Sequence, residues 1–133
     1  MILADTSVWA DHLRRPDPKM RVALQAGKVL VHPLVIGELA CGHLRTRTTL
    51  VQMQLLAQAN VATHDEVLNL IEQHQLMGRG VGYVDFNLLA SARLSKAKLW
   101  TRDKRLSEVA DEFSIRFDEE LIVVASNSKG SSS

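Results

Sequence analysis

The sequence lacks three features that would each place the protein in a distinct class. It has a single cysteine, Cys41, so no internal disulfide can form, which is compatible with a reducing compartment. No apolar run approaches the roughly 20 residues that a membrane span needs, and no basic segment precedes the first apolar residues. We therefore expect a soluble, unexported protein of the cytoplasm with no membrane partner.

The chain also lacks an excess of charge of either sign. Lys and Arg total 16, Asp and Glu total 15, and the net charge is +1, so any contact with a polyanion must be local. With 133 residues, 46% of them hydrophobic, the chain is long enough for one core and too short for two. We predict a single domain over residues 1–124 and a flexible, serine-rich tail over residues 125–133.

Short apolar runs alternate with longer amphipathic stretches along the chain. This pattern predicts an α/β fold with a short central parallel sheet of about five strands and helices on both faces. Expected strands cover residues 2–4, 29–32, 60–62, 98–101 and 115–117. Expected helices cover residues 8–14, 19–25, 35–45, 49–59, 65–76, 86–95 and 104–112. Residues 81–84 form either a further strand or an irregular approach to Asp85.

Four carboxylates stand where a parallel sheet gathers its functional groups. Asp5 and Asp103 each follow a predicted strand and precede a helix, Asp85 begins a helix, and Glu38 lies within one. Functional crevices of open α/β sheets lie outside the carboxyl ends of the strands, so the four side chains would converge if these elements are neighbours. The plainer alternatives are helix caps for Asp5 and Asp103 and a half-exposed glutamate for Glu38.

A cluster of carboxylates needs a cation or a proton. Two carboxylates about 5 Å apart repel by roughly 3 kcal/mol at an effective dielectric near 20, and helix N-termini favour the ionised forms. Oxygen ligands without cysteine or a spaced histidine pair suit Mg²⁺ or Mn²⁺ rather than zinc. We therefore predict phosphodiester hydrolysis, in which the metal polarises the phosphoryl oxygen and lowers the pKa of an attacking water. The predicted catalytic residues are Asp5, Glu38, Asp85 and Asp103, with Asp5, Asp85 and Asp103 as the metal ligands.

Polar and basic residues flank these carboxylates. The hydroxyls of Thr6, Ser7 and Thr101 are placed to support a ligand carboxylate or a metal-bound water, although capping and turn chemistry is the ordinary alternative. A polyanionic substrate also requires positive charge near the site. Arg79, before Asp85, and Arg102, beside Asp103, are the preferred phosphate contacts, with solvated surface charges as the alternative.

At this point the residues resemble a known family, the PIN-domain ribonucleases, and among them the VapC-type toxins of bacterial toxin–antitoxin pairs. The most specific segments are ILADTSVWADHLR, VIGELACG, GYVDFNLLASA and LWTRDKRL. The resemblance implies a PIN-like fold and endonucleolytic cleavage of RNA with Mg²⁺ or Mn²⁺ bound at the four carboxylates. It also implies products with 5′-phosphate and 3′-hydroxyl ends, a homodimer, and neutralisation by a cognate antitoxin protein whose tail occupies the acidic groove.

The chain departs from the family at one position. Some members carry a further acidic or amide residue two positions after the last aspartate, where this chain has Arg105. One metal ion is therefore the expectation, and a second stays open.

Two other functions compete with the nuclease. The first is a non-catalytic binding module whose acidic groove holds an Arg-rich partner peptide, which would show no cleavage of any RNA under Mn²⁺. An aspartyl-phosphate enzyme is disfavoured, because Ser7 stands where such a phosphatase typically has a second aspartate.

Apolar side chains leave two packing questions open. Trp9 either packs in the core or stacks on a base or a partner helix. Six further positions either belong to the core or line a groove between helices for an antitoxin helix or a second subunit. These are Val51, Leu55, Leu56, Val67, Leu68 and Ile71.

Overall fold

A three-stranded parallel sheet lies at the centre of the molecule, in the order β2-β1-β3. The structure, a computed structural model, describes residues 1–42 and 47–122. The strands are β1 (Ile2–Ala4), β2 (Val29–Leu30) and β3 (Lys98–Trp100). The helices are α1 (Thr6–Arg14), α2 (Pro18–Gln25), α3 (Pro33–Gly42), α4 (Arg47–Gln54), α5 (His64–Gln73), α6 (Tyr83–Leu94) and α7 (Lys104–Glu112), followed by the 3₁₀ turn η1 (Glu119–Leu121).

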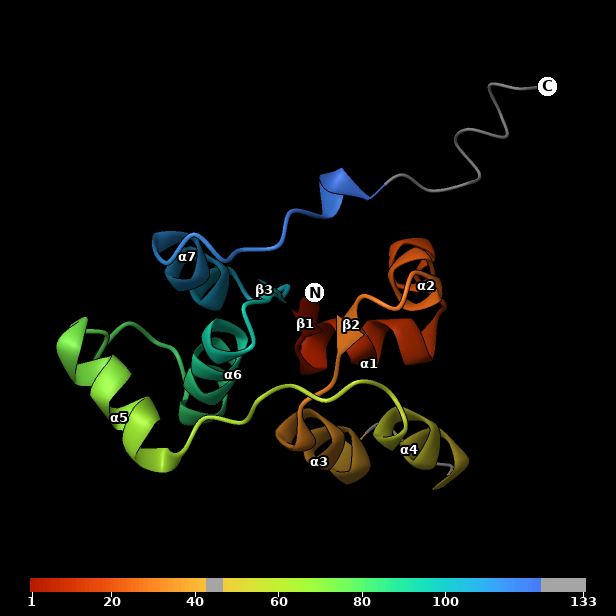
Figure 1. The fold of residues 1–133 in the computed structure, drawn as a ribbon, viewed down its shortest axis with the longest axis horizontal. Coiled ribbons are helices and arrows are strands. Elements are labelled where there is room, and N and C mark those ends of the chain that lie inside the picture. The colour runs from red at the N-terminus through yellow and green to blue at the C-terminus, as the bar shows by residue number, and fades with distance from the viewer. Residues whose placement is uncertain (43–46, 123–133) are drawn as a thin grey trace.

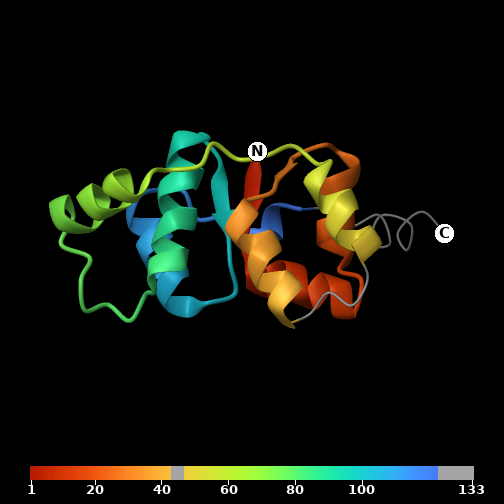
Figure 2. The same cartoon turned by 90° about the horizontal axis from the view of Figure 1, so that it is seen from below.

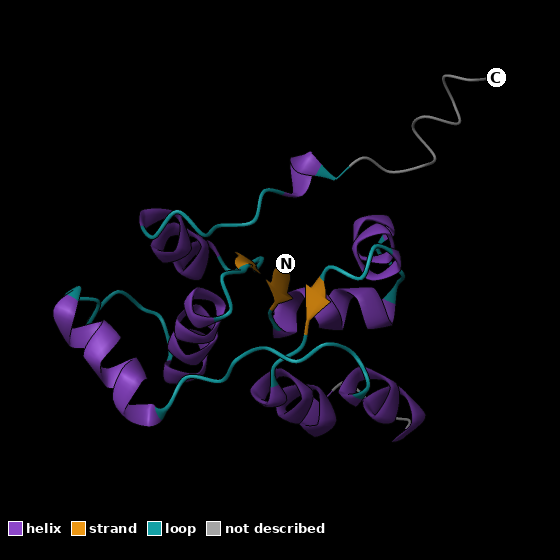
Figure 3. Cartoon of the chain, in the orientation of Figure 1, coloured by secondary structure: helices purple, strands orange, loops and turns teal. Residues whose placement is uncertain are grey.

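The helices form two groups, one on each side of the sheet. Figure 1 shows α1 to α4 gathered on the β2 side and α5 to α7 on the β3 side. Helix α1 packs against β1 and α3, whereas α6 packs against β1, β3 and α5. The view turned by 90° shows the same division (Figure 2), and Figure 3 shows how little of the chain is strand. The predicted α/β class is confirmed.

The expectation of about five strands is wrong, because each outer segment contributes only one isolated bridge. Val31 pairs with Gln58 and Leu99 pairs with Arg116, both in the parallel sense. The predicted strand at residues 60–62 fails for a specific reason: the Asn60 and Ala62 N–H groups donate to the hydroxyls of Ser95 and Ser91. Side chains of α6 thus replace the ladder partners that a strand would need.

Pairing between β1 and β3 positions the site. Leu3 is in register with Leu99 and Ala4 with Trp100, so Asp5 and Thr101 leave the sheet at the same edge. The Asp5 N–H donates to the Trp100 carbonyl at 2.9 Å and continues the ladder by one bond. The two strands whose ends carry Asp5 and Asp103 are therefore neighbours, as the convergence argument required.

Most predicted helices exist, with shifted ends. Helix α7 has the expected bounds, whereas α4 ends at Gln54, five residues before the expected end at 59. Helix α6 begins at Tyr83, so the approach to Asp85 is irregular and not a strand. The predicted end of the third helix at residue 45 and the proposed tail at residues 125–133 lie outside the described residues.

The apolar positions proposed to form one groove do not lie together. Val51, Leu55 and Leu56 lie in or just after α4 and the other three in α5, and these two helices are at opposite ends of the molecule (Figures 1 and 2). Val67 is fully buried, whereas Leu55 is 81% exposed. The single-groove hypothesis is therefore wrong. Within residues 1–42 and 47–122, no helix has the length and apolar character to cross a membrane.

Candidate active site

Asp5 is a buried carboxylate held by three donors. It caps α1, and its Oδ1 accepts hydrogen bonds from the Ser7 hydroxyl at 2.5 Å and the Val8 N–H at 3.1 Å. Its Oδ2 accepts a hydrogen bond from the Thr101 hydroxyl. Burial raises the pKa of Asp5, and these hydrogen bonds oppose that rise. Asp5 is thus both the cap of α1 and a candidate site residue, so the two interpretations of its position do not exclude each other.

Asp103 is joined to Asp5 through Thr101. The Thr101 hydroxyl donates to Asp5 and accepts from the Asp103 N–H at 3.0 Å. Asp103 caps α7, with its Oδ1 accepting from the Leu106 N–H at 2.9 Å, and its side chain is exposed. Ser7 makes a similar bridge, because its hydroxyl donates to Asp5 and accepts from the Arg102 N–H at 3.1 Å.

Asp85 approaches from α6. It lies in the first turn, and three apolar residues on its side of the helix, Leu88, Leu89 and Ala92, form an apolar stripe that is fully buried. The pKa of Asp85 is raised to about 6, mainly by burial and further by the charges of the other three carboxylates, Asp5, Asp103 and Glu38. No described residue donates a hydrogen bond to its carboxylate. The four carboxylates therefore lie within electrostatic reach of one another, and we call them the carboxylate centre.

Glu38 reaches the centre from an exposed helix face. The Thr6 hydroxyl donates to its Oε1, which links α3 to the first turn of α1. The side chains on the same face, Leu34 and Cys41, are exposed, so this face of α3 is not packed against the described residues. Each predicted polar support thus contacts a carboxylate: Thr6 contacts Glu38, and Ser7 and Thr101 contact Asp5.

The carboxylates of the centre interact electrostatically, but they are not close enough together to coordinate one ion. Among the described residues, no three His, Cys, Asp or Glu side chains lie close enough together to hold one metal ion. The donor set nevertheless fits a hard cation, since it consists of carboxylate and hydroxyl oxygens. The charges that raise the pKa of Asp85 are a negative potential that a cation would relieve. An ion would have to draw these side chains together.

Both arginines predicted to contact phosphate are engaged in ion pairs. Arg102 contacts Asp11 at 2.7 Å, Asp17 at 2.6 Å and Glu119 at 3.3 Å, and we call these four residues the Arg102 cluster. Arg79 contacts Glu112 through both terminal nitrogens, at 2.9 Å and 2.5 Å. Either arginine would have to leave its carboxylates before it could bind a phosphate.

One buried link between the segments that carry Glu38 and Asp85 was not anticipated from the sequence. His32 is fully buried, and its Nδ1 accepts from the Leu34 N–H at 3.0 Å, so its Nε2–H donates to the Ser91 hydroxyl at 3.0 Å. This bond ties the start of α3 to α6, the two helices that carry Glu38 and Asp85. A signal was present, because Ser91 interrupts the apolar stripe of α6.

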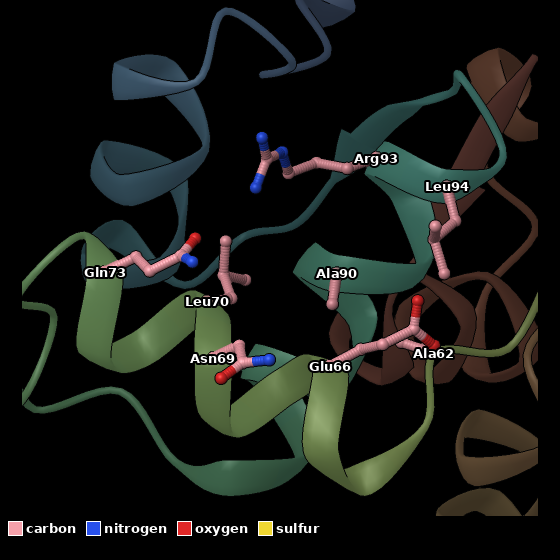
Figure 4. A pocket seen from close by; sticks show the side chains of 8 residues that line it. All are labelled: Ala62, Glu66, Asn69, Leu70, Gln73, Ala90, Arg93 and Leu94. Atoms are coloured by element: carbon pink, nitrogen blue, oxygen red, sulfur yellow. The ribbon is translucent and has the colours of Figure 1, made fainter.

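One cavity, of about 360 Å³, borders the centre and is lined in part by Asp103. Others lie away from the centre. One of about 420 Å³ lies between α5 and α6, lined by residues that include Glu66, Leu70 and Arg93 (Figure 4). Another of about 300 Å³ is bordered by Trp9, which is 3% exposed and whose indole N–H has no acceptor among the described residues. Trp9 is thus a packed residue beside an apolar hollow.

Comparison with known proteins defines the class. A family profile of the PIN domain matches residues 2–112. Ribonuclease VapC32 of Mycobacterium tuberculosis (strain CDC 1551 / Oshkosh) is 46% identical over 123 residues, covering 91% of this chain and 99% of the relative. The protein of the same name from strain ATCC 25618 / H37Rv matches to the same extent. The chain therefore belongs to the PIN-domain family and, within it, to the VapC-like toxins.

Two solved structures share the fold. FitAcB from Neisseria gonorrhoeae has a TM-score of 0.61 at 18% identity, covering 91% of this chain and 99% of that one. PAE2754 from Pyrobaculum aerophilum has a TM-score of 0.53 at 19% identity, covering 80% and 77%. These likenesses confirm the PIN-like arrangement around the short parallel sheet.

Proposed function

We propose that this protein is a divalent-metal-dependent endoribonuclease, the toxin of a toxin–antitoxin pair, and that Asp5, Glu38, Asp85 and Asp103 carry its chemistry. The observation that supports this most is the coupling of Asp85 to the other three carboxylates. Repulsion among these carboxylates at one sheet edge lowers the stability of the metal-free protein, and a bound cation would offset that repulsion. The 46% identity to a protein named a ribonuclease supports RNA as the substrate.

The metal site uses the three aspartates, with Mg²⁺ or Mn²⁺ as the ion and one ion as the expectation. When bound, the ion supplies Lewis acidity toward a phosphoryl oxygen and lowers the pKa of a bound water. Ser7 and Thr101 hold the Asp5 carboxylate in one orientation, and Thr101 also fixes the backbone of Asp103. Glu38, an exposed residue whose carboxylate accepts a hydrogen bond from Thr6, would accept a proton.

The test is cleavage of RNA by purified protein with Mg²⁺, with Mn²⁺ and with a chelator. Asp85→Asn should lower the rate more than about a hundredfold, because even residues that only support metal ligands cost about 10–100-fold when lost. Asp65→Asn is the matched control, since Asp65 occupies the first turn of α5 as Asp85 does in α6. Equal activity of Asp85→Asn and wild type would refute the carboxylate mechanism.

The same experiment separates the nuclease from a binding module. A folded protein that binds an Arg-rich peptide in its acidic groove, yet cleaves no RNA under Mn²⁺, would favour the non-catalytic alternative. The partners proposed with the nuclease are a cognate antitoxin protein and a second copy of the chain. Light scattering of the isolated protein tests the homodimer, and co-purification with the product of an adjacent gene tests the antitoxin.

A further inference from the structure

Arg105 stands next to the carboxylate centre without a carboxylate of its own. It lies in the first turn of α7, two residues after Asp103, and is exposed. No ion pair joins it to any residue in 1–42 or 47–122. Glu108, one turn further along α7, instead contributes with Glu112 to the charges around Arg79. Arg79 and Arg102 each form ion pairs, whereas Arg105 forms none with the described residues.

Arg105 gains no stabilisation from the dipole of its own helix, because it lies at the positive end of α7. The first turn of α7 contains no acidic residue, and a helix N-terminus repels cations. A residue that violates a local rule without a compensating contact is a candidate for ligand binding.

A glycine provides the seat for the Arg105 side chain. Gly80, in the loop that leads to Asp85, has φ +77°, and a Cβ built there would lie 2.9 Å from Arg105 Cδ and 3.0 Å from Cζ. Any other residue at position 80 would displace the guanidinium. The bare backbone therefore lets Arg105 lie across the segment between α5 and α6, beside the approach to Asp85.

We propose that Arg105, seated on Gly80, binds a phosphate of the RNA substrate that lies against the carboxylate centre. This inference rests on the proposed ribonuclease function. The guanidinium is a planar fork that matches two oxygens of one phosphate, and it keeps its charge at every working pH. It supplies the positive flank that a polyanion needs beside an acidic site, a role closed to Arg102 and Arg79 while they remain paired.

Binding of a labelled single-stranded RNA of mixed sequence, in the non-cleaving Asp85→Asn background, tests the proposal. Arg105→Gln should raise the Kd about tenfold, since a hydrogen bond to a charged group is worth about that factor. The dependence of log K on log salt should become shallower by about 0.7, the value for one lost phosphate contact on a single strand. Arg105→Lys should keep the salt slope and lose only part of the affinity. Lys28→Gln, which removes a charge at the opposite edge of the sheet, should change neither quantity.

Two glycine substitutions distinguish the loss of the Arg105 contact at Gly80 from the effect of backbone strain. Gly78 has φ +75° with nothing within 4 Å of a built Cβ, so Gly78→Ala introduces the same strain as Gly80→Ala without touching Arg105. Gly80→Ala should weaken RNA binding severalfold, Gly78→Ala should not, and Gly80→Ala should add nothing in an Arg105→Gln background.

The outcomes distinguish this inference from the function it rests on. Unchanged affinity and salt slope in a folded Arg105→Gln protein, while wild type cleaves RNA, would overturn the phosphate contact alone. Equal effects of the two glycine substitutions would also overturn it. A wild-type protein that neither binds nor cleaves RNA would overturn both proposals.

Discussion

The two halves of the carboxylate centre are held in different ways. Asp5 and Asp103, at the ends of neighbouring strands, each cap a helix and are joined through Thr101. Glu38 and Asp85, on α3 and α6, receive far less: one hydroxyl contacts Glu38, and no described donor contacts Asp85. Asp5 and Asp103, the strand-end half, are thus fixed in position before a cation binds. Glu38 and Asp85, the helical half, are kept apart from the other carboxylates by charge repulsion. Cation binding should therefore order α3 and α6 more than α1 and α7.

The flanking arginines repeat the contrast. Arg102 belongs to the strand-end half and is surrounded by three carboxylates, which fasten α1, the start of α2 and η1 to the loop before Asp103. Arg105 is unpaired and lies over the loop that leads to Asp85. One arginine contributes to the fold and the other is available to a ligand.

Apart from the loss of a carboxylate itself, the largest expected effect comes from breaking the strand-end half at Thr101. Thr101→Val keeps the shape but loses the hydrogen bonds to Asp5 and from the Asp103 N–H. We expect RNA cleavage to fall about 10–100-fold, with a higher metal concentration needed for half-maximal activity, as for other residues that orient metal ligands. Thr48→Val, on the exposed face of α4, is the control. Wild-type metal dependence in Thr101→Val would remove the preorganisation argument.

Next in size is the loss of the Arg102 cluster. Arg102→Gln leaves three carboxylates without their shared cation, so the free energy of unfolding should fall by about 1–2 kcal/mol, more than a single surface pair provides. Urea unfolding measures it, and the loss should shrink at high salt. Arg116→Gln, which breaks one pair at 3.4 Å, should cost less. Arg105→Gln should leave stability unchanged or slightly higher, and the reverse ranking would contradict the assigned division of roles.

Relieving the helical half should stabilise the protein. Asp85→Asn should raise the free energy of unfolding at pH 7 by about 1 kcal/mol, a figure discounted from the full shift because Asp85 is half-exposed. Since its pKa rises from 3.8 to about 6 on folding, the destabilisation grows as pH rises through that window and is fully present above it. Below pH 3.8 the carboxyl is protonated in both states, so the gain should disappear. Thermal unfolding at pH 7 and pH 3.5 checks both points, and an unchanged or lower stability at pH 7 would argue against repulsion.

The smallest effect concerns the buried link between α3 and α6. Burial lowers the pKa of His32, so the unfolded chain takes up a proton near pH 6.5 that the folded protein resists. Its contribution is therefore fully present above pH 6.5 and is lost as pH falls below that value. Because Asp85 titrates with the opposite sign, the comparison must be between variants. The free energy of unfolding should decrease less between pH 7 and pH 5 in His32→Gln than in the wild type. His74→Gln, which changes an exposed site, should not alter that decrease.

Local signals in the sequence predicted the strand-end half well. An apolar strand followed by Asp and a helix describes Asp5, and a second such pattern describes Asp103, because caps act within one turn of the chain. The pairing of β1 with β3 was only a condition of the sequence-based hypothesis, and the structure supplies it. The four carboxylates identified from the sequence are the ones that couple electrostatically in the structure.

Long-range partners decided what the sequence could not predict. Residues 60–62 have the composition of a strand, but the hydroxyls of Ser91 and Ser95 take their N–H groups. Arg102 looked available until the fold placed Asp11, Asp17 and Glu119 around it. Each miss depends on a neighbour that is distant along the chain.

Asp5 and Asp103 each cap a helix and also belong to the carboxylate centre, and this has a genetic consequence. Each begins a helix, so most random replacements there would damage folding together with activity and leave little protein to detect. Asp85 does not cap its helix, and its replacement by a neutral residue should raise the stability of the protein. A screen for cells that survive expression of this toxin should therefore recover abundant, full-length, inactive protein chiefly from changes at Asp85.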